Sequence, residues 1–188
     1  MVLVQNAEVL LTKQRIIGKV FNLFGEMAEV LQQLMEAVSL PASVQQLSPK
    51  IARGENYELL PYVMLDYPRF FSREHVLAIR TFFWWGNFFS VTLQLKGMYL
   101  EQYAPSIVAK RLQLGAAGFH IAVTDDEWRH DHYPDHYTPM ATLDAAATEK
   151  LLDHPFCKLS ARIPLSEWND ATVRFRTLYD VLMMVLKD

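Results

Sequence analysis

The sequence predicts a single α+β domain in which a mostly antiparallel sheet is packed by a long N-terminal helix and a C-terminal helix. Three observations predict this fold class: a helical apolar repeat at the start of the chain, a β-hairpin signature around Gly86, and later strands with one apolar and one polar side. The chain has 188 residues, 51% of them hydrophobic, which is enough for one core. No internal repeat or linker divides residues 1–188, so we expect one domain.

The first element is a long amphipathic helix over residues 6–38, with Asn6 as its expected N-cap. Its apolar residues recur every seven positions and form a broad stripe, which is typical of a helix packed on the protein's own sheet. An unbroken helix of this length would measure about 50 Å, whereas a globule of this size has a radius of gyration of about 16 Å. We therefore expect either a break, at Gly18 or Gly25, or one end that projects and pairs with a second subunit.

A β-hairpin over residues 77–96 is the clearest local prediction. Gly86 and Asn87 suit a two-residue type II′ turn, because they lie between two runs rich in aromatic and β-branched residues. This turn fixes the register of the whole hairpin. The expected pairs next to it are Trp84 with Phe89, against the core, and Trp85 with Phe88, on the opposite face.

The two faces of the hairpin differ in chemistry. One is apolar apart from Arg80, whose buried charge would need a partner, either Asp66 or Glu74. The other face mixes aromatic and polar side chains, as a ligand-binding surface does. Its candidate ligand-binding residues are Thr81, Phe83, Trp85, Thr92 and Gln94.

The remaining elements follow from local signals. Residues 41–54 are expected to form a loop, and residues 57–68 a short extended piece interrupted by prolines. After the hairpin we expect helices over residues 104–114, from Thr142 to His154, and over residues 166–187, the last with Val173, Leu178, Val181, Leu182 and Val185 facing inward. Strands are expected over residues 119–123 and 157–165, each with an apolar and a polar side.

The segment from Asp125 to Tyr137 is the candidate functional site. It gathers three of the six histidines, five carboxylates and three aromatics in a stretch with neither a helical nor a strand period. A long loop without secondary structure is uncommon in a compact domain and is usually functional or disordered. The aromatic residues argue against disorder.

Two chemistries fit this loop. His130, His132 and His136 have a spacing that a turned loop can bring onto one zinc or other divalent ion, a candidate cofactor. Without a metal, His120, His130, Arg80 and Glu127 are the candidate catalytic or ligand-binding side chains. A third interpretation is an ordinary solvated loop, and the known catalytic motifs that would decide against it are absent.

Three classes of function therefore remain open. The first is a small-molecule site, for an anionic ligand, or a small hydrolase-like enzyme at residues 125–137. The second is a homodimeric interaction module that uses the N-terminal helix. The third is single-stranded nucleic-acid binding on an aromatic and basic sheet face, formed by Phe83, Trp85, Phe88, Lys96, Lys158 and Arg162. The formal net charge of −3 makes nucleic acid the least favoured partner.

The sequence also predicts a cytoplasmic, non-membrane protein. The single cysteine, Cys157, cannot form an internal disulfide and is expected on the core side of its strand. The start of the chain lacks the pattern of a secretory leader. The apolar stretch over residues 76–95 contains Arg80 and a turn, so it is interpreted as a hairpin rather than a membrane span.

Overall fold

A seven-stranded antiparallel sheet is the centre of the computed structural model, which describes residues 5–187. The strands are β1 (Lys50–Tyr57), β2 (Leu60–Phe71), β3 (Val76–Trp84), β4 (Phe88–Lys96), β5 (His120–Ala122), β6 (Tyr137–Pro139) and β7 (Phe156–Pro164), in the order β1-β2-β3-β4-β7-β5-β6. The helices are α1 (Ala7–Met35), α2 (Ala42–Gln45), α3 (Met98–Ala109), α4 (Arg111–Ala116), α5 (Ala145–Leu152) and α6 (Ala171–Leu186). The α+β prediction is confirmed.

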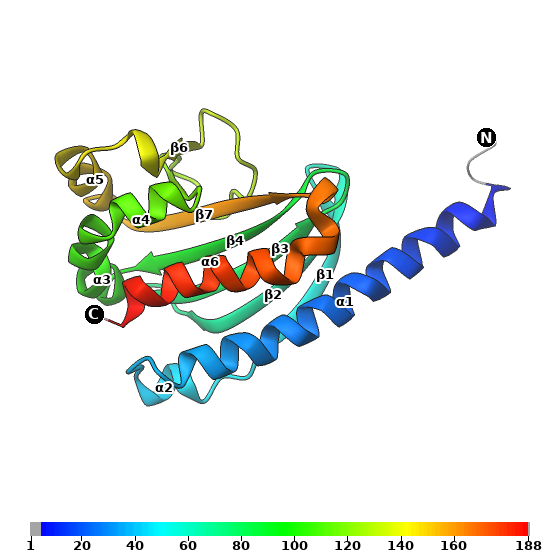
Figure 1. Ribbon diagram of the computed structural model, residues 1–188, viewed down its shortest axis with the longest axis horizontal. Coiled ribbons are helices and arrows are strands. Elements are labelled where there is room, and N and C mark those ends of the chain that lie inside the picture. The colour runs from blue at the N-terminus through cyan, green and yellow to red at the C-terminus, as the bar shows by residue number, and fades with distance from the viewer. Residues whose placement is uncertain (1–4, 188) are drawn as a thin grey trace.

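The two faces of the sheet are covered differently. Helices α1 and α6 lie on one face, here called the helix-side face, and α3, α4 and α5 gather at one end of the molecule (Figure 1). Residues 123–136, here called the covering loop, cross the opposite face, here called the loop-side face. The main core lies under the helices, and a smaller aromatic cluster of Phe82, Trp84 and Phe88 lies on the loop-side face.

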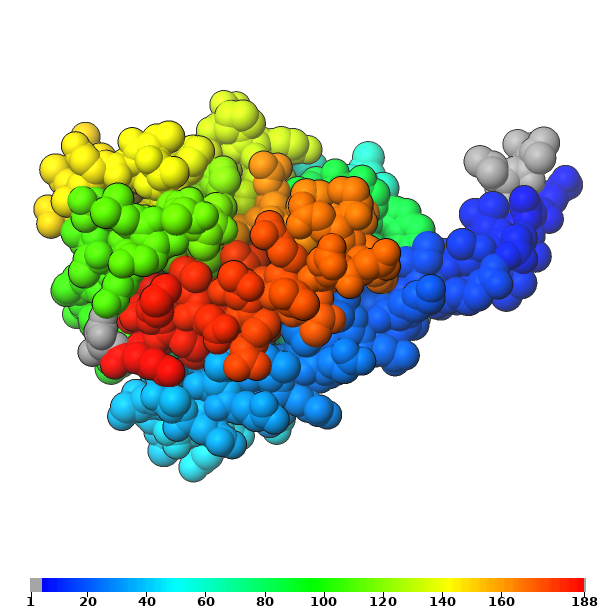
Figure 2. Space-filling model, in the orientation of Figure 1, coloured from blue at the N-terminus to red at the C-terminus, as the bar shows by residue number. Residues whose placement is uncertain are grey.

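Helix α1 is continuous, and one of its ends projects. Asn6 caps it as predicted, because its side chain accepts a hydrogen bond from the Glu8 amide at 3.0 Å. The helix passes through Gly18 and Gly25 without a break and ends at Met35. Its second half packs into the core, whereas its first turns extend away from the body (Figures 1 and 2). None of the helices within residues 5–187 is long and apolar enough to cross a membrane.

The register of the β3–β4 hairpin differs from the predicted one by one residue. Three residues, Trp85 to Asn87, join the strands, and Trp84 pairs with Phe88. The Asn87 amide donates to the Trp84 carbonyl at 3.0 Å, which closes a turn whose third residue, Gly86, has the left-handed φ of 72° that glycine adopts readily. Every residue of β3 is buried, so the apolar pattern could not distinguish the two registers.

This shift moves the side chains of β3 to the faces opposite to those predicted, whereas those of β4 lie on the predicted faces. Phe83 therefore pairs with Phe89 in the helix-side core, and Trp84 lies with Phe88 on the loop-side face. Arg80 is likewise on the loop-side face, where it pairs with Asp66, one of its two predicted partners. The predicted alternation of β7 is confirmed, with Cys157, Leu159, Ala161 and Ile163 in the helix-side core.

Strands β1 and β2 enlarge the sheet beyond the prediction. The sequence indicated a loop and a short extended piece there, because prolines interrupt the pattern. Pro61 lies at the start of β2, between the paired residues Leu60 and Tyr62, where its missing N–H interrupts no paired position, and Pro68 lies where the β2–β3 register shifts, between Asp66 and Arg69.

The helix boundaries also need correction. Helix α3 begins at Met98 and contains Pro105, so proline does not mark its start. Asp144, rather than Thr142, caps α5, by accepting from the Ala147 amide at 2.7 Å. A 3-10 turn over Leu165–Asp170 precedes α6. Val173, near the start of α6, is exposed and does not face inward as predicted.

Gly97, between β4 and α3, is a position where we expect substitution to be costly. Its φ is 58°, and an added Cβ would overlap Glu74 and His75. We expect Gly97→Ala to lower the free energy of unfolding by about 1 to 3 kcal/mol in urea denaturation. Gly25→Ala is the control, because no heavy atom lies within 4 Å of its added Cβ and alanine favours a helix interior by about 0.5 to 1 kcal/mol. Equal losses in both variants would contradict the strain at Gly97.

Candidate functional site

The covering loop is bound to the sheet by polar side chains that the antiparallel register places on one face. Arg80, Thr92, Lys158 and Ser160 all lie on the loop-side face, in three adjacent strands. Each is buried beneath the loop. A polar sheet face is stable under protein only when its groups are hydrogen-bonded, so the contacts of these residues determine what the site can do.

Asp131 and Tyr57 anchor the centre of the loop. Asp131 is fully buried. The Tyr57 hydroxyl donates to its carboxylate at 3.2 Å and accepts from the backbone amides of His130 and Asp131 at 2.7 and 3.0 Å. His136 Nδ1 contacts the other carboxylate oxygen at 2.5 Å. Burial raises the pKa of Tyr57 to about 12, so at neutral pH the hydroxyl keeps the proton that it donates to Asp131.

Arg80 forms a buried ion pair beside the loop. Its Nε and Nη2 donate to the two carboxylate oxygens of Asp66 at 2.7 and 2.8 Å, a bidentate geometry. Its Nη1 lies 3.0 Å from His130 Nε2. Because arginine can only donate, His130 Nε2 is the acceptor, and the ring proton of the neutral imidazole resides on Nδ1.

Lys158 lies on the other side of the His130 ring. Its Nζ donates to the Glu127 carbonyl at 3.1 Å and to the Arg129 carbonyl, and lies 3.5 Å from His130 Nδ1. A neutral amine has two N–H donors and one lone pair, which match two carbonyls and one Nδ1–H group. Burial, followed by the charge of Arg80, lowers the pKa of Lys158 to about 7. The contacts and the lowered pKa both favour an uncharged Lys158 above about pH 7.

The same surroundings keep His130 neutral. Burial lowers the pKa of His130 well below the ordinary value, and the positive charges of Arg80 and of Lys158, when Lys158 is protonated, add to the effect. Both of its ring nitrogens are engaged by protein groups. His130 is therefore a structural link between the loop and the sheet, and its geometry does not suit the predicted role of a general base.

His132 forms a second link. Its Nε2 lies 2.9 Å from the Ser160 hydroxyl, and its ring stacks on Tyr137 with the centroids 4.6 Å apart. Within residues 5–187 its buried Nδ1 has no hydrogen-bond partner, and burial lowers its pKa to about 2. Ser160 is buried and also hydrogen-bonds to Thr92 at 2.7 Å. This serine–histidine pair therefore lacks the accessible hydroxyl and the oriented imidazole of a nucleophilic site.

The predicted metal ligands do not converge. His130 faces Arg80 and Lys158, His132 faces Ser160, and His136 faces Asp131. Within residues 5–187, no group of three or more His, Cys, Asp or Glu side chains is placed to hold a metal ion. The structure thus does not bring the three imidazoles onto a common point, because each ring has a different partner: His130 and His132 contact different side chains of the sheet, and His136 contacts Asp131 within the loop.

The predicted ligand-binding residues divide between the two faces. Thr92 and Gln94 face the covering loop, where Gln94 and Lys96 contact the Glu127 carboxylate at 3.5 and 3.3 Å. The other three lie on the helix side: Thr81 hydrogen-bonds to Tyr179 at 2.5 Å, and Phe83 and Trp85 pack against the main core. The one-residue register shift caused this error. Phe83, Trp85 and Phe88 therefore do not form a common stacking platform.

Two of the hollows beside the covering loop are lined by predicted site residues. One, of about 360 Å³, is lined by His120, Arg162, Phe88, Asn87, Gly118 and Pro164. Burial lowers the pKa of His120. The other, here called the Arg80 hollow, has the same volume of about 360 Å³ and lies at the opposite edge of the loop. It is lined by Lys50, Ala52, Met64, Asp66, Arg69, Phe71, Arg80 and Trp128.

Sequence reasoning identified the loop and Arg80 but missed Tyr57, Lys158 and Ser160 as their partners. Lys158 and Ser160 had a signal, since they occupy the polar side of an alternating strand. Tyr57 had none, because its strand was not recognised.

The geometry thus combines a rigid polar scaffold with an open hollow beside a buried arginine. No protein-family model, curated protein or solved structure matches this chain. The interpretation of the site therefore depends on its own shape and charge.

Proposed function

We propose that this protein binds an anionic small molecule in the Arg80 hollow. The observation that carries the proposal is the charge of the lining: three cations, Lys50, Arg69 and Arg80, face one carboxylate, Asp66. Because Asp66 neutralises one cation, an excess of positive charge remains that an anion would balance. The volume of about 360 Å³ falls within the usual range for small-molecule sites.

The lining also suits a ligand with a flat apolar part. Phe71 and Trp128 lie on the wall of the hollow with their ring centroids 6.4 Å apart. Trp128 is 54% exposed, which is unusual for so large an apolar side chain unless something covers it. Asp66 and His130 accept three of the five N–H donors of the Arg80 guanidinium, so among the contacts within residues 5–187 two donors remain for a ligand.

Binding is a better account than the hydrolase-like alternative. Hydrolysis needs an accessible nucleophile or base, whereas His130 uses both ring nitrogens within the scaffold and Ser160 is buried. The groups that line the Arg80 hollow are cations, apolar and aromatic side chains, and the carboxylate of Asp66, which is held by Arg80; such a set binds and orients a ligand.

The experiment compares benzoate, inorganic phosphate and uncharged benzamide, followed by the NMR signal of the Trp128 indole N–H. We expect benzoate to shift this signal and to bind at least about tenfold more tightly than benzamide, because only the anion meets the cations. Lys50→Gln/Arg69→Gln should weaken benzoate binding, whereas Arg174→Gln/Arg176→Gln on α6, away from the hollow, should not. The proposal fails if none of the probes shifts Trp128, if benzamide binds equally well, or if the α6 variant has the same effect.

A second candidate function, self-association through α1, is favoured by a separate observation. Val9, Leu10 and Leu11 are 46%, 62% and 57% exposed on the projecting end of α1. These side chains point to different sides of a helix that leaves the body, so apolar surface is exposed around much of its projecting end, and a partner would cover it.

A further inference from the structure

The projecting end of α1 has a definite chemical character. Within Ala7–Lys19, here called the arm, the charged residues are Glu8, Lys13, Arg15 and Lys19, a net charge of +2. Arg15 pairs with Glu8 and Lys13 with Glu55 of β1, but both are surface pairs, which contribute little and can exchange partners. Ile17 packs in the core, and Lys19 beside it is exposed. A helix also carries a partial positive charge at its N-terminus. The arm therefore presents apolar side chains together with positive charge.

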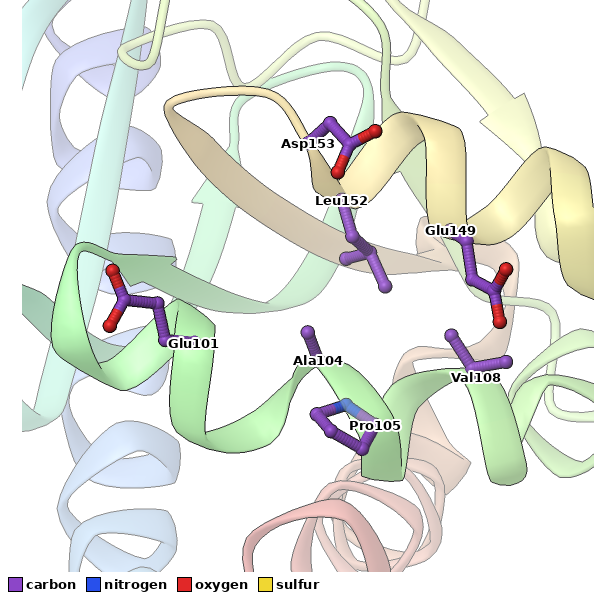
Figure 3. A pocket seen from close by; sticks show the side chains of 7 residues that line it. All are labelled: Glu101, Ala104, Pro105, Val108, Glu149, Leu152 and Asp153. Carbon is purple, nitrogen blue, oxygen red and sulfur yellow. The ribbon is translucent and has the colours of Figure 1, made fainter.

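A groove of the opposite character lies between α3 and α5. It has a volume of about 450 Å³ and an apolar floor of Ala104, Pro105, Val108 and Leu152. The charged side chains that line it are all carboxylates: Glu101, Glu149 and Asp153. Leu152 and Glu149 point from α5 toward α3, where Ala104 and Val108 face them (Figure 3). The small Ala104 leaves room for another helix to approach closely.

We infer that the arm of a second copy of this chain docks in this α3–α5 groove. The arm and the groove are complementary in both respects, apolar side chains facing an apolar floor and cations facing three carboxylates. They lie at opposite ends of the molecule (Figure 1), so a chain cannot place its arm in its own groove. The inference rests on the self-association proposed above and adds the surface that receives the arm.

The contact joins two different surfaces, so each copy both donates an arm and receives one. Two copies that do so reciprocally close a dimer. Because the rim of the groove is charged, the association should weaken as salt is added.

The first experiment measures the molar mass of the whole protein by light scattering over a range of concentrations. We expect Leu10→Ser to raise the dissociation constant by about tenfold or more. Leu112→Ser is the matched control, since Leu112 is a leucine 69% exposed on α4 and does not line the groove. A wild-type protein that stays monomeric up to about 1 mM would overturn both self-association and the groove assignment.

The second experiment tests the groove by reversing charges. Arg15→Glu/Lys19→Glu reverses the arm, and Glu149→Lys/Asp153→Lys reverses the groove. Each variant alone should be monomeric, because its arm and groove now carry like charges, and an equal mixture of the two should associate. If the groove variant associates as the wild type does while Leu10→Ser abolishes association, the arm binds elsewhere. That result would overturn the groove assignment and leave self-association in place.

Discussion

Replacing Arg80 by methionine is expected to lower the free energy of unfolding by about 3 to 5 kcal/mol, because the buried carboxylate of Asp66 would lose its bidentate partner. His130 would lose a hydrogen bond at the same time. Chemical denaturation at neutral pH measures the loss. It should exceed that of any other single substitution proposed for this protein.

Two further variants test the cause. Asp66→Leu/Arg80→Met removes both charges, and we expect it to recover much of the lost stability, since no uncompensated ion remains. Arg176→Met breaks a surface ion pair, in which the side chains of Arg176 and Asp180 are 52% and 54% exposed. It should lower the free energy of unfolding by about 0.5 kcal/mol or less. If Arg80→Met costs as little as Arg176→Met, the Arg80–Asp66 pair contributes no more than a surface contact.

The stability of this protein is expected to rise between pH 7 and pH 8.5. In the unfolded chain Lys158 has a pKa of about 10.4, whereas in the folded protein its pKa is lowered to about 7. Between these values the unfolded chain binds a proton that the folded protein lacks, so the free energy of unfolding increases with pH, by about 1.4 kcal/mol per unit. The gain over this interval is about 2 kcal/mol.

Outside the range from pH 7 to pH 8.5, other groups with shifted pKa values also change the stability. His130 and His132 contribute a slope of the same sign only below about pH 6.5, since their pKa values are lowered from that value. Burial raises the pKa of Cys157 to about 12, so above about pH 8.5 this thiol gives a slope of the opposite sign. Asp126, Glu127 and Asp131 act on Lys158 in the other direction, but burial and Arg80 outweigh them.

Lys158→Met is the variant that isolates this effect. It removes the titrating amine but keeps an unbranched side chain, and its stability should be nearly constant over the same interval. Urea denaturation at half-unit pH steps gives both slopes. Equal slopes in the wild type and in Lys158→Met would show that Lys158 is charged in the folded protein.

The sequence predicted the elements whose local pattern is strong. Helix α1 was predicted from its cap and its apolar repeat, and β7 from its alternation of apolar and polar residues. The hairpin was predicted, but its register was wrong because both of its faces are buried and residues on either side of Trp84 look equally apolar. Strand β2 was predicted only in part, as an extended piece that ends at Pro68, because the strand continues past this proline through pairing with its neighbours, which a local pattern cannot reveal.

The candidate site was predicted in place but not in detail. The unusual composition of residues 125–137 distinguishes the loop from the rest of the sequence. What the histidines do there depends on Arg80, Ser160 and Lys158, which are 28 to 50 residues away in the chain. Such long-range contacts leave no periodic signal, so the composition suggested a metal site where the structure has separate hydrogen bonds.

The pairing of β4 with β7 has a consequence for how the chain folds. About sixty residues separate these neighbouring strands, and closing so long a segment is slow because its entropy is lost before the contacts form. The covering loop belongs to that segment, and its anchors on β1, β3 and β7 exist only once the sheet is assembled. The loop should therefore dock late, so that substitutions in it change the rate of unfolding more than the rate of folding.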